Sequence, residues 1–197
     1  MFLEAIIAAI VFVSFALQVI LNLPDDGTLV NSVWQLLRYF TILTNLAIGV
    51  VMLRAVATQV MPSAQVSAAM TTWIIVVGLV YHALLAQQIS PATLAFWADQ
   101  GLHTAVPILT VLWWGVRARK KPLRPVQAVI WAAFPVAYLI YTLGRGMVDG
   151  VYPYFFVDPR ITSWGAIAAW VAALASLFVL LGLGLIFLAR SRWLQRF

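Results

Sequence analysis

Four polar side chains share one face of the segment LLRYFTILTNL (residues 36–46), which lies within a long apolar stretch. Relative to Thr41 they are spaced at i−3, i, i+3 and i+4, so a helix brings them together: Arg38, Thr41, Thr44 and Asn45. A charged side chain at membrane depth costs about 2.5–3.5 kcal/mol on insertion scales, and such a residue is a functional hypothesis by default. We interpret this face as part of a candidate site.

A threonine hydroxyl becomes a nucleophile when a neighbouring base takes its proton, and a neutral imidazole suits that task. Thr41 lies seven residues beyond Trp34, and His103 lies six residues beyond Trp97. At the helical rise, these spacings place the two side chains about 10 Å and about 9 Å from tryptophans that mark the membrane interface. Thr41 and His103 are therefore candidates for a nucleophile and its base. Alternatively, Thr41 has a purely structural role, in which its hydroxyl donates to a carbonyl of its own helix.

Further polar side chains are expected at the same depth, and they supply candidates for substrate binding or for oxyanion stabilisation. These candidates are Arg38, Thr44, Asn45, His82, Tyr141, Arg145, Tyr152 and Asp158. Arg38 or Asn45 is expected to donate to the oxyanion, since fixed donors in a dry site stabilise that charge strongly. Asp158 or Tyr152 is expected to orient His103.

Two prolines interrupt the helices that carry this polar layer. Pro107 lies four residues after His103, and Pro135 lies four residues after Trp131. Each proline removes the helical partner of a carbonyl, and such a carbonyl is tolerated in a membrane where it meets protein groups or water. We predict a water-containing cavity that opens toward the outer side, with the aromatic segment 144–163 as a lid over acyl chains.

The composition places the whole chain in a membrane. Of its 197 residues, 64% are hydrophobic and 9% are charged, and the mean hydropathy is +0.99, whereas a water-soluble domain carries about a quarter charged residues. Six stretches approach the roughly 20 apolar residues that span a bilayer: 3–22, 35–54, 69–88, 99–116, 124–143 and 163–189. We predict an all-α membrane protein, with residues 1–197 forming a single domain that is a bundle of six transmembrane helices.

Charge asymmetry predicts the orientation of this bundle. Nine of the twelve basic residues fall on one side: Arg54, Arg117, Arg119, Lys120, Lys121, Arg124, Arg190, Arg192 and Arg196. Five of the six acidic residues fall on the other: Asp25, Asp26, Asp99, Asp149 and Asp158. Basic residues gather on cytoplasmic loops, so both termini are expected to be cytoplasmic and the polar layer to face the outer leaflet of the cell membrane. The net charge of +6 follows from this rule and from anionic lipid, and nucleic-acid binding is not needed to explain it.

Three blocks resemble the androgen-induced-protein-like family of intramembrane threonine hydrolases in their order and spacing. The blocks are RYFTILTNL (38–46), GLHTAVPIL (101–109) and VYPYFF (151–156). The resemblance implies a multi-span enzyme, similar to a bacterial six-span relative, that hydrolyses fatty acid esters of hydroxy fatty acids. It also implies that Thr41 is the nucleophile and His103 the base, with no metal or cofactor required. Outside these blocks the similarity is mostly hydrophobicity.

Two other functions remain open. His82 and His103 lie on consecutive antiparallel spans at similar depth, an arrangement that would place two imidazoles on a b-type haem. Alternatively, Thr41 and His103 bond helices together in a non-catalytic lipid-binding protein. A transporter is disfavoured because the polar residues fade beyond the midplane. The main prediction is an esterase whose lipid substrate arrives sideways from the outer leaflet.

Overall fold

The computed structural model describes residues 1–86, 89–118 and 123–190. Within these ranges the chain is helical and contains no strand. The elements η1 and η2 are π-helical turns, and η3 is a 3-10 turn. In chain order the elements are α1 (Phe2–Asp26), α2 (Leu29–Leu36), α3 (Phe40–Thr58), α4 (Ala64–Val80), η1 (Tyr81–Leu85), α5 (Leu94–Gln100), η2 (Gly101–Ala105), α6 (Val106–Val116), α7 (Val126–Trp131), α8 (Ala133–Asp149), η3 (Phe155–Val157) and α9 (Trp164–Arg190).

Among the described residues, five helical stretches are long and apolar enough to cross a membrane, which indicates a multi-pass membrane protein. They are Phe2–Asp26, Phe40–Thr58, Ala64–Leu85, Val126–Asp149 and Trp164–Arg190. The predicted stretch 99–116 lies within a continuous helical run formed by α5, η2 and α6, and it is not one of the five. Asp99, Gln100 and His103 make this run less apolar than its neighbours.

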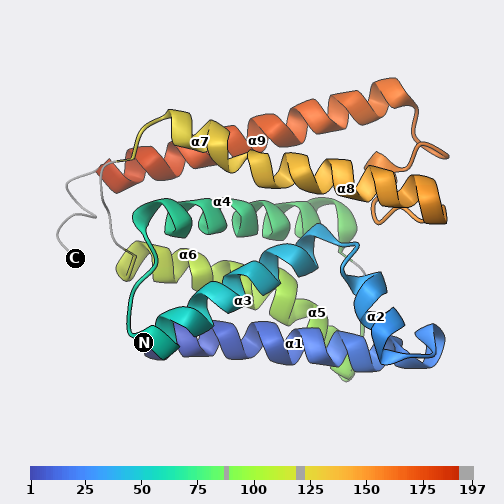
Figure 1. Ribbon diagram of the computed structural model, residues 1–197, viewed down its shortest axis with the longest axis horizontal. Helices are drawn as coiled ribbons and strands as arrows, with labels where there is room; N and C mark the ends of the chain where they lie inside the picture. The colour runs from blue at the N-terminus through green and yellow to red at the C-terminus, as the bar shows by residue number, and fades with distance from the viewer. Residues whose placement is uncertain (87–88, 119–122, 191–197) are drawn as a thin grey trace.

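The helices form layers, as Figure 1 shows. The layer of α7, α8 and α9 (yellow to red) lies against α4, and α4 separates it from α1, α3 and α6. The start of α1 and the end of α9 lie at one end of the bundle, and α2 and the end of α8 lie at the other. Of the predicted basic side, Arg119, Lys120, Lys121, Arg192 and Arg196 lie outside the described residues.

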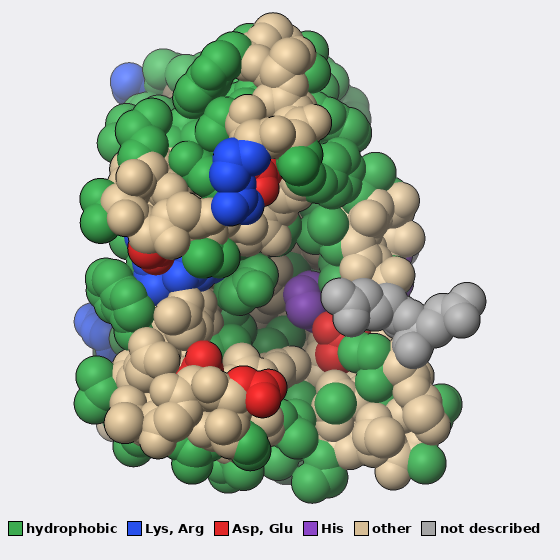
Figure 2. All heavy atoms as spheres, turned by 90° about the vertical axis from the view of Figure 1, so that its right-hand side faces the viewer, with side chains coloured by type: hydrophobic (Ala, Val, Ile, Leu, Met, Phe, Trp, Pro, Cys, Tyr) green, Lys and Arg blue, Asp and Glu red, His purple; other side chains and the backbone are tan. Residues whose placement is uncertain are grey.

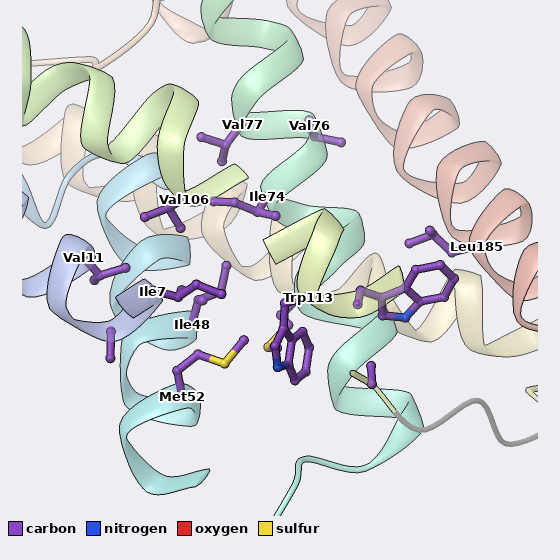
Figure 3. Close-up of a cluster of buried hydrophobic side chains, with 14 of the residues drawn as sticks. Ile7, Val11, Ile48, Met52, Ile74, Val76, Val77, Val106, Trp113 and Leu185 are labelled. Atoms are coloured by element: carbon purple, nitrogen blue, oxygen red, sulfur yellow. The ribbon is translucent and has the colours of Figure 1, made fainter. Parts of the chain in front are cut away.

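The main hydrophobic core joins α1, α3, α4 and α6 (Figure 3). Ile7, Ile48 and Ile74 are fully buried in it, and they meet the fully buried indole of Trp113. The Trp113 indole N–H donates to Oε1 of Glu4 at 2.8 Å, which partners one carboxylate oxygen inside the bundle. This core fixes the position of α3 relative to α6. The start of α3 carries Thr41, and the turn η2, which leads into α6, carries His103.

Both π-helical turns lie near the end of the bundle that holds α2. In η1 the Ala86 N–H donates to the Tyr81 carbonyl, and in η2 the Val106 N–H donates to the Gly101 carbonyl. A π-helical turn inserts an extra residue into a helix, and such turns are frequent at functional sites. Here they carry both histidines of the chain, since His82 lies in η1 and His103 lies in η2.

The predicted interruption at Pro135 is present. The helix breaks between α7 and α8, and the Trp131 carbonyl accepts a hydrogen bond of 2.9 Å from the Trp73 indole N–H of α4. A protein donor thus replaces the helical partner that Pro135 removes.

Gly101 allows η2 to approach α1 closely. A Cβ at position 101 would lie 2.0 Å from Oγ and 3.0 Å from Cβ of Ser14. Since Gly101 begins the turn that carries His103, this contact sets how deeply the imidazole lies in the bundle.

We expect Gly101→Ala to lower the melting temperature in detergent, because overpacking of this kind costs about 1–3 kcal/mol. Gly115→Ala is the matched control, because a Cβ there meets nothing within 4 Å and alanine is the better helix former. Equal melting temperatures for the two variants would contradict the close contact between η2 and α1.

Candidate active site

A cavity of about 120 Å³ lies between α4, α8 and α9, beside the start of α3. Four of its lining residues have polar side chains, and all four are hydroxyls: Thr41, Tyr81, Tyr138 and Tyr154. The rest of the lining is apolar and includes Val77, Leu139 and Phe178. An apolar cavity with a few converging polar groups is the usual form of a small-molecule site.

The helix break between α2 and α3 places Thr41 at this cavity. The predicted span 35–54 is wrong at this point, because α2 ends at Leu36 and α3 begins at Phe40. Tyrosines of α8 bind the carbonyls at the break: the Tyr138 hydroxyl donates to the Arg38 carbonyl at 2.9 Å, and the Tyr141 hydroxyl donates to the Leu37 carbonyl at 3.3 Å. These tertiary bonds replace the helical bonds that a continuous span would make.

The Arg38 side chain holds the same break. Its two terminal nitrogens donate to the two carboxylate oxygens of Asp149 at 3.2 and 3.1 Å. It also donates to the Val151 carbonyl at 2.6 Å and to the Gln35 side chain. Arg38 is only 3% exposed. Both terminal nitrogens are thus occupied within the protein, which differs from the expected role at an oxyanion.

Thr41 is the second residue of α3 and is 8% exposed. The Tyr154 hydroxyl lies at this helix start: it accepts from the Phe40 N–H at 3.1 Å, and it interacts with the backbone and side chain of Thr41. The first amides of a helix have no intrahelical partner and carry a partial positive charge. The Thr41 hydroxyl therefore lies in an electropositive position inside an apolar cavity.

Asn45 connects the Thr41 helix to the His103 turn. Its side-chain nitrogen donates to the Thr41 carbonyl at 2.8 Å and to the Leu102 carbonyl at 3.2 Å. Both donors of the amide are used, so Asn45 also differs from the expected oxyanion donor. Because one nitrogen reaches both carbonyls, the backbones that carry Thr41 and His103 are neighbours.

Asp99 is the residue that orients His103, whereas Asp158 or Tyr152 was expected in this role. His103 Nδ1 lies 3.0 Å from Oδ1 and 3.1 Å from the carbonyl oxygen of Asp99. Both oxygens accept, so in the neutral ring Nδ1 carries the proton and Nε2 holds the lone pair. The Tyr81 hydroxyl donates to Oδ2 of the same carboxylate, and the Tyr81 ring stacks on His103 with centroids 3.9 Å apart.

Tyr81 contacts both the cavity at Thr41 and the His103 imidazole, which is not among the residues that line the cavity. It lines the cavity together with Thr41, and its ring covers one face of the His103 imidazole. Among the described residues, no hydrogen bond joins the Thr41 hydroxyl to His103, and Nε2 of His103 has no hydrogen-bond partner there. Catalytic hydrogen bonds are commonly long before a substrate binds.

His82 faces away from this cavity. Its side chain is exposed, and Nε2 bonds Oγ1 of Thr104 at 3.0 Å. Thr104 in turn donates to Gln100 at 2.7 Å, and the Gln100 amide donates to Asp99 at 3.3 Å. His82 thus reaches the Asp99 carboxylate through two side chains.

The other predicted candidates lie around the site. Arg145 donates to Asp149 at 3.2 Å and to the Tyr141 hydroxyl at 2.9 Å, and it stacks over Trp34. Thr44 is fully buried, and its hydroxyl has no partner among the described residues. Arg145 thus supports the helix break, and neither Arg145 nor Thr44 lines the cavity.

The two candidates of the segment 150–163 bind locally. The Tyr152 ring packs against Gly146 of α8. Asp158 accepts from Nε and the backbone N–H of Arg160, both at 2.9 Å, and this guanidinium holds the pKa of the Asp158 carboxyl below its usual value. The expected lid over residues 144–163 begins only at Gly150, because α8 continues to Asp149. Its residues Tyr154, Phe156 and Val157 line the cavity.

Figure 2 shows the end of the molecule that holds α2. The surface is hollowed at its centre, and a His side chain lies in the hollow with basic side chains on one side and acidic side chains nearby. The polar layer predicted for the outer leaflet is therefore gathered at one end of the bundle.

Asp99, Tyr81 and Tyr154 are the site residues that sequence reasoning did not assign. The Asp99–His103 pair has i, i+4 spacing, which places both on one helix face, so this signal was available. Comparison of the chain with protein-family models, with curated proteins and with solved structures finds no match.

We expect Arg38→Met to destabilise the protein by about 1–3 kcal/mol, because the acceptors that Arg38 satisfies at Asp149, Val151 and Gln35 lose their donor. Arg54→Met in α3 is the control, since the Arg54 side chain is exposed. The measurement is thermal unfolding in one detergent, and similar losses for both variants would show that Arg38 does not hold the break.

Proposed function

We propose that the protein is an intramembrane lipid esterase in which Thr41 is the nucleophile and His103 is the general base. The observation that carries the proposal is the pair of hydrogen bonds from the Asn45 side chain to the Thr41 and Leu102 carbonyls. These bonds bring the backbone at Thr41 next to the backbone at His103, whose imidazole binds Asp99. The cavity supports it, because Thr41 and Tyr81, which stacks on His103, line one apolar space suited to an acyl chain.

In the first half of the reaction, Thr41 Oγ1 attacks the ester carbonyl carbon while Nε2 of His103 takes the hydroxyl proton. The carbonyl electron pair moves to oxygen, and the tetrahedral intermediate collapses when it expels the alcohol. His103 returns its proton to that alcohol. Asp99 holds Nδ1–H throughout, which fixes the ring and stabilises the imidazolium.

In the second half, water attacks the acyl-Thr41 ester and gives its proton to Nε2 of His103. Collapse of this second intermediate releases a fatty acid, and His103 reprotonates Thr41. The sum is one ester and one water converted to one acid and one alcohol. For Nε2 to reach Thr41, the Tyr81 ring has to shift from its stacked position or a water has to bridge the two groups.

The substrate class proposed is a fatty acid ester of a hydroxy fatty acid, held with an acyl chain in the cavity. Val136 of α8 lines the cavity and is 50% exposed, and Ala175 of α9 lines it and is also exposed. The cavity thus reaches the exposed surface between α8 and α9, where a lipid would arrive sideways.

We also propose six spans, cytoplasmic termini and a site in the outer half of the cell membrane. The basis for this orientation is that basic residues lie near the opposite end of the bundle.

The likeness of the three sequence blocks to the threonine hydrolase family is consistent with this placement. Thr41 and Tyr154, which come from the first and third blocks, meet at the cavity, and Asn45 of the first block binds the Leu102 carbonyl of the second. A non-catalytic lipid-binding protein would use the same cavity without turnover. A b-type haem on His82 and His103 would instead give the purified protein a Soret band.

We expect Thr41→Ala to abolish hydrolysis of the ester in proteoliposomes and labelling by a fluorophosphonate, while Thr41→Ser retains part of both. Thr72→Ala is the control, because Thr72 is equally buried and its hydroxyl bonds its own helix at Ala68. Equal labelling of the wild-type protein and Thr41→Ala would remove Thr41 from its role.

We expect Asp99→Asn to lower kcat by at least about a hundredfold, the scale of general-base catalysis, because the amide no longer fixes Nδ1 as the donor. Asp25→Asn, an exposed acid near the same end, should leave kcat unchanged. If Asp99→Asn kept full turnover, His103 would not be acting as an oriented base.

A further inference from the structure

The attack of Thr41 on an ester requires a donor for the oxyanion, and the two residues singled out for this role in the sequence, Arg38 and Asn45, bind other groups. The terminal nitrogens of Arg38 bind Asp149, Val151 and Gln35. Both amide hydrogens of Asn45 bind backbone carbonyls. A different group has to meet the charge that forms at the Thr41 hydroxyl.

The Tyr154 hydroxyl is the side-chain donor placed beside that position. It lines the cavity, and it interacts with the Thr41 side chain and backbone. Its oxygen accepts the Phe40 N–H at 3.1 Å, so its own O–H is directed away from that amide. Burial raises the pKa of Tyr154, whereas the Thr41 side chain and backbone lower it, as donors to the phenol oxygen do. A phenol can accept and donate at once, so the Tyr154 O–H can donate to an acceptor that enters the cavity.

We propose that the Tyr154 hydroxyl donates a hydrogen bond to the oxyanion formed when Thr41 attacks the ester, which makes Tyr154 a further catalytic residue. This inference rests on the proposed function. In the resting protein the Tyr154 hydroxyl interacts with Thr41; during attack, Thr41 Oγ1 becomes an ester oxygen, and the Tyr154 hydroxyl keeps its proton and donates a hydrogen bond to the carbonyl oxygen that gains the electron pair. No covalent bond to Tyr154 forms or breaks.

The electrostatic surroundings favour this role. The start of α3 adds its partial positive charge at the same place. Burial raises the pKa of Tyr154 to about 12, so the phenol keeps its proton at neutral pH and remains a donor. In an apolar, water-poor cavity such a fixed donor stabilises charge more than it does in water.

Aromatic contacts hold the Tyr154 ring in place. It stacks on Phe156 with centroids 5.1 Å apart and an angle of 8°, and Tyr39 packs against it edge-on at 6.1 Å. Phe156 in turn packs on Trp170 of α9 at 5.7 Å. The hydroxyl is therefore positioned before a substrate binds, which is what an oxyanion donor requires.

The test is Tyr154→Phe, measured in proteoliposomes with a fatty acid ester of a hydroxy fatty acid. We expect kcat to fall on the order of 10²–10³-fold, the loss seen for a single oxyanion donor, with KM changed little. The affinity for an alkyl trifluoromethyl ketone, which forms a tetrahedral adduct with the nucleophile, should fall in parallel, while affinity for the product fatty acid is kept. Tyr39→Phe is the matched control, because it removes a hydroxyl from the neighbouring ring.

The outcomes separate this inference from the proposed function. If the wild-type protein neither hydrolyses the ester nor labels at Thr41, the proposed function fails. If the wild-type protein is active and Tyr154→Phe keeps its kcat while its melting temperature falls, Tyr154 only caps Phe40 and the inference is overturned. Parallel loss of kcat and ketone affinity, with product affinity retained, supports it.

A second measurement applies if Tyr154→Phe does not fold. Replacement of Tyr154 by 3-fluorotyrosine leaves the shape nearly unchanged, and its ¹⁹F resonance reports the bonding of the hydroxyl. We expect this resonance to shift when the trifluoromethyl ketone binds, and to stay in place in the Thr41→Ala background. A resonance that does not move in the active protein would overturn the inference.

Discussion

The broken backbone between α2 and α3 is the constraint that the rest of the site depends on. A helix interrupted inside a membrane protein exposes carbonyls at one helix end and amides at the next, and protein groups have to satisfy them. Tyr138 and Tyr141 of α8 bind the carbonyls, and Tyr154 binds an amide. The Arg38–Asp149 ion pair joins the same two regions of the chain. Because these partners come from α8 and from the segment after it, the break also defines one wall of the cavity.

The site then has two halves that different interactions organise. The hydroxyl half lies at the start of α3, where the side chains of Thr41 and Tyr154 interact beside the partial positive charge of the helix N-terminus. The imidazole half lies in η2, where Asp99 binds Nδ1 of His103, and Nε2 has no hydrogen-bond partner in the described part of the chain. Asn45 holds the two backbones together, and Tyr81 lines the cavity and stacks on His103. The proposed chemistry needs either a shift of the Tyr81 ring or a bridging water, and Tyr81 lies in a π-helical turn, a kind of turn that is frequent at functional sites.

Hydrophobic length was enough to predict most of the fold, since an apolar run long enough to cross a bilayer has few alternatives to a helix. The interruption at Pro135 was also predictable, because proline cannot donate to the Trp131 carbonyl. The break before Phe40 was not, because its cause is tertiary: Asp149 is more than a hundred residues from Arg38. The meeting of Tyr154 with Thr41 depends on the path of a loop, and no local pattern encodes it. Asp99 differs from these, since its spacing from His103 alone indicates a shared helix face.

Trapping of an acyl-enzyme would test the central claim most directly. Wild-type protein in proteoliposomes is mixed with the ester for milliseconds, quenched in acid, digested and examined by mass spectrometry. The account predicts one acylated peptide, with the acyl group of the substrate on Thr41, that appears before the free fatty acid and decays as the acid accumulates. Hydrolysis without any acyl adduct on Thr41, or with the adduct on another side chain, would contradict it.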